Sequence, residues 1–208
     1  MASGFIVICI MVLSFMYWCV NDTKGLYAGM AALVALWAYL LLEHLGVPFP
    51  ANAAGGFLAG VIVLVAYVLV SRRIKEQLAK GGFRTGMIAS AAFSFGMILY
   101  RPSLAFIMAG GLTLGLGTGY CLCKFYFKFT ESAFSGRSGA VKYITLAARF
   151  LLGIIILAAL YAVTGKMTDN IHHSGNYQLF VFMRFTLLSL WVSAGAPWLF
   201  RLLRLAGN

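Results

Sequence analysis

Long apolar stretches separated by short polar segments run along the whole chain. Each stretch is roughly 16–22 residues long, close to the ~20 residues that a helix needs to cross ~30 Å of hydrocarbon. We predict membrane-spanning helices at about 4–20, 26–46, 56–71, 85–100, 104–123, 143–164 and 179–200. The pattern indicates an all-α, polytopic transmembrane helical bundle of about seven spans, or about six if the first segment does not cross. Residues 1–208 are expected to form a single integral-membrane domain, because the loops are too short to enclose a second core.

Composition agrees with the apolar pattern. The chain is 62% hydrophobic and only 10% charged, whereas a soluble domain is about 45–50% apolar and about 25% charged. The four cysteines lie in or beside apolar stretches, and the Cys121-x-Cys123 pair has no second pair in a comparable loop. A zinc site is therefore not expected. We expect neither a metal nor a cofactor.

The net charge of +11 has a topological explanation. Lys and Arg concentrate in the loops 71–84 and 124–142 and at the C-terminus, and seven spans place all three on one side. Because positive loops face the cytoplasm, this predicts the N-terminus outside and the C-terminus inside. Nucleic acid is not an expected partner, although such a charge would suggest it in a soluble protein.

The glycine-rich segment GGLTLGLGTG covers residues 110–119. It resembles a phosphate-binding loop in composition only, because no Lys-Ser/Thr pair follows and no strand precedes it. Gly111, Gly115 and Gly119 recur every four residues on one helix face, which allows two membrane helices to approach closely. We therefore expect these glycines to serve helix packing.

Several polar residues fall within or just outside the predicted spans. Arg149 is expected to extend towards the nearer interface, whereas Arg184 can either do the same or pair with Glu43 at similar depth. A candidate anion or lipid-headgroup site on the outer side comprises Arg101, Lys166, His172, His173 and Arg184. The alternative interpretation is a solvated loop over residues 165–177. No HExxH motif or supported Ser-His-acid arrangement marks a catalytic centre.

The stretch LGVPFPANAAGGFLAG, residues 45–60, resembles the third active-site motif of membrane lipid phosphatases of the type-2 phosphatidic acid phosphatase family. The family motif runs roughly S-R-x-x-x-G-x-H and continues F/Y-P-x-D-x-x-x-G. The match passes through Gly46, Phe49, Pro50, Gly56 and Gly60. The closing stretch FMRFTLLSLWVSAGAPWLFRLLRL, residues 182–205, resembles the last helix of certain bacterial members.

The chain departs from this family at the residues that perform its chemistry. The catalytic histidine of the motif falls on Pro48, the phosphate-binding arginine on Leu42 and the usual aspartate on Asn52. Proline can neither attack phosphorus nor carry charge, and leucine cannot replace a bidentate arginine. The family's Pro-Ser-Gly-His motif has no counterpart. The resemblance thus implies a degenerate motif made of Leu42, Gly46, Pro48, Phe49, Pro50 and Asn52.

These departures imply a catalytically inactive relative, a pseudo-phosphatase with no catalytic residues. It would act as a structural or accessory subunit or as a lipid-headgroup binder in a bacterial inner membrane. Two alternatives stay open: a lipid phosphate phosphatase with a rearranged outer-face site, and a small transporter or flippase component. The expected partners are membrane lipids and a larger membrane protein complex.

Overall fold

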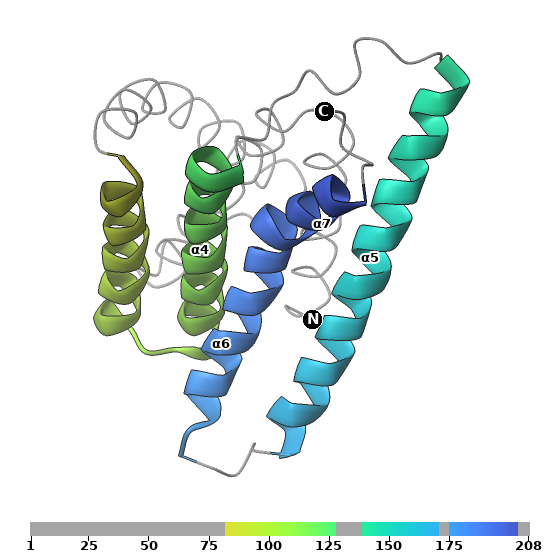
Figure 1. Cartoon of the computed structure of the whole chain (residues 1–208). Coiled ribbons are helices and arrows are strands. Elements are labelled where there is room, and N and C mark those ends of the chain that lie inside the picture. The colour runs from red at the N-terminus through yellow and green to blue at the C-terminus, as the bar shows by residue number, and fades with distance from the viewer. Residues whose placement is uncertain (1–81, 128–138, 171–174, 204–208) are drawn as a thin grey trace, which may run out of the picture.

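The computed structural model describes residues 82–127, 139–170 and 175–203, and all regular structure in these ranges is helical (Figure 1). The first helix covers Gly82–Tyr100. The elements that follow are α4 (Leu104–Leu122), the π-helix η2 (Cys123–Phe127), α5 (Gly139–Asn170), α6 (Tyr177–Leu190), the π-helix η4 (Trp191–Gly195) and α7 (Ala196–Leu202).

Four helices are long and apolar enough to cross a membrane: Gly82–Tyr100, Leu104–Tyr126, Tyr143–Thr168 and Tyr177–Leu202. They confirm the last four predicted spans to within a few residues. The three predicted spans before residue 72 lie outside the described residues. The protein is an integral membrane protein with several transmembrane helices.

Two turns set the direction of the four helices. The helix Gly82–Tyr100 ends just before Arg101, and Pro102 disfavours a helical conformation for that residue. Ser103, in an extended conformation, caps α4 by accepting a hydrogen bond from the Phe106 N–H at 3.5 Å. This turn and the connection between α5 and α6 lie at the same end of the bundle (Figure 1). Helices α4 and α6 therefore run parallel to each other, and α5 runs antiparallel to both.

Helix α6 lies between α4 and α5 and contacts both (Figure 1). Of the most apolar window of each span, 61% is buried in α4 and 44% in α6, against 17% in α5 and 11% in the helix Gly82–Tyr100. A helix that is apolar on all sides is either a buried core helix or a membrane span. Helices α4 and α6 thus form the centre of the described bundle.

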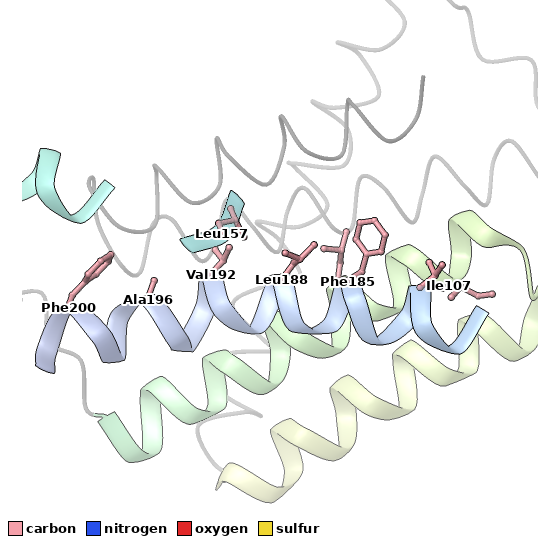
Figure 2. Packing of buried hydrophobic residues seen from close by; sticks show 9 residues of the cluster. Ile107, Leu157, Phe185, Leu188, Val192, Ala196 and Phe200 are labelled. Atoms are coloured by element: carbon pink, nitrogen blue, oxygen red, sulfur yellow. The ribbon is translucent and has the colours of Figure 1, made fainter. Parts of the chain in front are cut away.

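The described core is a stripe along one side of α6, η4 and α7. Its members recur every three or four residues, the spacing of one helix face, and they are Phe185, Leu188, Val192, Ala196 and Phe200. Ile107 of α4 and Leu157 of α5 complete the cluster with two further side chains, Leu112 and Val181 (Figure 2). Since lipid tails are as apolar as these side chains, close packing rather than removal from water holds the cluster together.

The π-helix η4 precedes Pro197, which explains the local change in hydrogen bonding. The Ala196 N–H donates to Trp191 O, five residues back, instead of the usual four. Pro197 has no N–H to donate to Ser193 O, its expected acceptor in an α-helix. Cys123 Sγ lies 3.0 Å from this oxygen and donates to it. The proline thus makes a backbone acceptor accessible to the neighbouring helix.

Candidate functional site

The closest helix contact joins the glycine face of α4 to α6 and η4. The backbone of Phe182 lies against Gly111, that of Thr186 against Gly115, and Ser193 Oγ against Gly119. A side chain at any of the three glycines would collide with these groups. Direct backbone approach of this kind is what small residues permit between membrane helices.

Two serines bridge this contact through their hydroxyl groups. Ser193 Oγ lies 3.2 Å from Gly115 O and 2.7 Å from Ser189 O, so its proton can be donated to either carbonyl. Ser189 Oγ lies 3.4 Å from Gly111 O and 2.9 Å from Phe185 O. Both side chains are fully buried. Their hydroxyl groups find acceptors within the protein, as polar groups in hydrocarbon must.

Arg149 of α5 lies inside the protein. Its side chain is only 2% exposed, and its guanidinium carbon lies 5.9 Å from the centre of the Phe200 ring. The prediction that Arg149 extends towards the interface is therefore wrong. The physical reason is that the aromatic ring of α7 faces the guanidinium group, and a cation over a ring face is electrostatically favourable.

Arg184 of α6 occupies a different environment, between α6 and α5. Its guanidinium carbon lies 4.4 Å from the centre of the Tyr161 ring, and its Nη2 donates to Tyr161 O at 3.3 Å. A Cβ on Gly165 would lie 3.1 Å from Nη2, so this glycine leaves room for the guanidinium. The Nε atom is buried and has no hydrogen-bond partner. Arg184 is thus held in place while part of its hydrogen-bonding capacity is unused.

The other predicted members of the outer site are not gathered around Arg184. Arg101 lies exposed in the turn before α4, and Lys166 lies exposed on α5 next to Gly165. None of the hydrogen bonds or ring contacts of Arg184 involves either of them. His172 and His173 lie outside the described residues, as do Leu42, Gly46, Pro48, Phe49, Pro50 and Asn52 of the expected degenerate motif, and also Glu43.

Within the described part of the chain, no three His, Cys, Asp or Glu side chains lie close enough to hold a metal ion. The side chains described there include no histidine, aspartate or glutamate at all. Their ionisable groups are cations, tyrosines and the buried thiols of Cys121 and Cys123. The described side chains of this bundle thus include cations and hydrogen-bond donors.

Comparison with known families connects this bundle to phosphatases. Residues 107–208 match the family model described as "PAP2 superfamily phosphatase, transmembrane extension". Over these residues the chain is similar to the transmembrane extension of PAP2 superfamily phosphatases. No curated protein and no solved structure matches it.

The matched region starts within α4 and includes all of α5, α6, η4 and α7. It therefore contains Gly111, Gly115 and Gly119 together with Arg149 and Arg184. The resemblance noted for residues 182–205 falls inside it, whereas residues 45–60 fall outside it. Sequence reasoning missed the serines that face the glycines; Ser189 and Ser193 repeat the four-residue spacing of the glycines, and this was the available signal.

Proposed function

We propose that the chain is a non-catalytic membrane domain that supports a PAP2 superfamily phosphatase as a structural or accessory subunit. The observation that carries the proposal is the chemistry of the transmembrane extension. Several of its described polar side chains join helices: Ser189 and Ser193 lie within hydrogen-bond distance of carbonyls of α4, and Trp191 Nε1 donates to Gly153 O at 3.3 Å.

Phosphoryl transfer requires groups of another kind. A covalent route needs a nucleophile in contact with its base, and the developing charge needs preorganised cationic or N–H donors around the phosphoryl oxygens. The described side chains supply no such pair. The resemblance of residues 45–60 adds support, because Pro48 and Leu42 stand where the related enzymes keep histidine and arginine.

The first test is phosphate release by the purified chain. Phosphatidic acid and undecaprenyl pyrophosphate are supplied in detergent micelles, with an active family member and a mock purification alongside. We expect release equal to the mock control, since loss of a single transition-state donor already lowers rates about 10²–10³-fold. Turnover above the mock control contradicts the proposal. If that turnover disappears in His172→Ala or Arg101→Ala, an outer-face enzyme replaces it.

The second test addresses the supporting role. The tagged chain is purified from its native membrane in a mild detergent, and co-purifying proteins are identified by mass spectrometry. We expect a PAP2 superfamily phosphatase to co-purify with the wild-type chain and to be lost with Gly115→Leu, which disrupts the α4–α6 contact. The matched variant Gly96→Leu, at a glycine with open space around it, should retain the phosphatase. Retention by all three proteins, or absence from all three, contradicts the proposal.

A further inference from the structure

Arg184 places a positive charge well inside a membrane span. It lies seven residues after Tyr177, the first residue of α6, which corresponds to about 10 Å along the helix. Cations at such positions are costly, and they commonly mark functional sites. The contacts of Arg184 include no carboxylate; they are a carbonyl oxygen of α5, the Tyr161 ring and the Phe185 ring. Among the side chains that the structure describes, none forms an ion pair with it.

The hydrogen bonds of Arg184 are incomplete as well. A guanidinium group has five N–H donors, and one of them, on Nη2, reaches Tyr161 O at 3.3 Å. The Nε donor is buried without an acceptor. A buried donor without an acceptor costs free energy, and a polar group kept at such a cost within a membrane span commonly marks a functional site.

The described surroundings hold the guanidinium plane in position. The Tyr161 ring lies 4.4 Å from the guanidinium carbon, and Gly165 presents no side chain to Nη2. Arg184 itself is only partly buried, and the exposed Lys166 follows Gly165 in α5. Arg184 and Lys166 thus place two positive charges near the end of the bundle where α5 and α6 are joined.

We propose that Arg184, Tyr161 and Gly165 form a binding site for a phosphate-type oxyanion at the membrane face that carries the α5–α6 connection. Paired oxygens of a phosphate match the planar fork of a guanidinium group and would accept from its Nη atoms. The oxyanion belongs either to a lipid headgroup or to free phosphate. The inference does not depend on the absence of phosphatase activity, since an active enzyme could carry the same site.

The test is a binding titration of the purified chain in neutral detergent micelles. Dioleoyl phosphatidic acid and inorganic phosphate are the two probes, and bound lipid by native mass spectrometry and the thermal shift are the readouts. We expect Arg184→Gln to weaken binding at least about tenfold, the loss that follows from removing a charge-assisted hydrogen bond. Arg184→Lys keeps the charge without the fork and should weaken binding less. Arg201→Gln, an exposed cation at the other end of α6–α7, should bind within about twofold of wild type.

A second variant keeps the proposal testable if Arg184→Gln does not fold. Gly165→Ala retains the arginine but adds a methyl group about 3.1 Å from Nη2 of Arg184. We expect several-fold weaker binding and an unchanged helical circular dichroism spectrum. Binding of phosphatidic acid alone identifies a lipid headgroup, and binding of inorganic phosphate identifies a soluble anion. No binding of either probe by wild type, or equal binding by wild type and Gly165→Ala, overturns the proposal.

Discussion

The two interfaces of α6 are built in opposite ways. Towards α4, glycines and serines bring the two backbones into direct contact, and hydroxyl groups reach the carbonyls of Gly111 and Gly115. Towards α5, long side chains span the gap, with Trp191 bonded to Gly153 O and Arg184 bonded to Tyr161 O. The first interface has no room for another molecule. The second leaves the buried Nε of Arg184 without a hydrogen-bond partner and holds the proposed oxyanion site.

This difference follows from how helices associate in hydrocarbon. Without a hydrophobic driving force between spans, dispersion contacts and interhelical hydrogen bonds determine the strength of the contact. Small residues maximise backbone contact, so the α4–α6 interface should tolerate no added volume. Large polar side chains make fewer contacts of lower density, so the α5–α6 interface should tolerate substitution better.

The largest effect is expected for Gly115→Leu. A Cβ at this position would meet Ser189 Oγ and the backbone oxygen of Thr186, which cannot move without displacing α6. Overpacking of this kind typically costs ~1–3 kcal/mol. We expect a clear fall in the apparent Tm of the purified protein in detergent.

The matched control for this substitution is Gly96→Leu. Gly96 lies in the helix Gly82–Tyr100, and a Cβ there meets nothing within 4 Å. Leucine also favours helix by roughly 0.5–1 kcal/mol over glycine in a helix interior. Its Tm should therefore equal or exceed that of wild type. Equal losses in the two variants would mean that α4 and α6 do not depend on backbone contact at Gly115.

A smaller effect is expected for Trp191→Phe, which probes the interface with α5. The half-buried indole donates to Gly153 O at 3.3 Å, and phenylalanine keeps a ring but loses this bond. Bonds between membrane helices contribute on average about 0.6 and at most about 1.7 kcal/mol. We expect a loss of about 1 kcal/mol in the free energy of unfolding, measured by thermal unfolding.

Trp198→Phe is the matched variant, because Trp198 is 48% exposed. Its free energy of unfolding should stay within about 0.5 kcal/mol of wild type. If Trp191→Phe and Trp198→Phe were equally stable, the hydrogen bond of the Trp191 indole would not contribute to this interface.

The sequence predicted the helices that form these interfaces better than it predicted which residues of two helices face each other. Helix positions follow from the length and charge of each segment alone, so the last four spans were predicted closely. The face formed by Gly111, Gly115 and Gly119 could be read from its spacing, whereas its pairing with Ser189 and Ser193 depends on the relative register of two helices far apart in the sequence. No local pattern encodes that register.

Arg184 and Arg149 differ in how well the sequence predicts their contacts. Counting outwards from the α5–α6 connection places Arg184 opposite the segment that holds Tyr161 and Gly165, because the two helices are antiparallel neighbours. That juxtaposition was within reach of the sequence. The burial of Arg149 against Phe200 was not, since it requires α7 to fold back towards α5. Pro197 predicts a break in the hydrogen bonding of the last span. It does not predict that Cys123 donates to the carbonyl oxygen of Ser193.

The smallest effects are expected for two serine substitutions, which should not change the unfolding free energy in the same direction. Ser193→Ala removes a hydroxyl group that lies within hydrogen-bond distance of Gly115 O and Ser189 O. Given the average for bonds between membrane helices, the loss should be about 0.6 kcal/mol. The measurement is again the unfolding free energy in detergent, and a double variant with Ser189→Ala should lose more than either single variant.

Ser90→Ala gives the opposing case within the same bundle. The Ser90 hydroxyl packs against Gly117 of α4, but its oxygen is buried and has no hydrogen-bond partner. Replacing it by a methyl hydrogen removes an unsatisfied polar group at little loss of volume, which is neutral or stabilising. We therefore expect Ser193→Ala to lower the unfolding free energy and Ser90→Ala to leave it unchanged or raise it. If both substitutions lowered the unfolding free energy equally, packing volume rather than hydroxyl-to-carbonyl bonding would hold α4 against its neighbours. The two interfaces of α6 would then differ only in the size of their side chains.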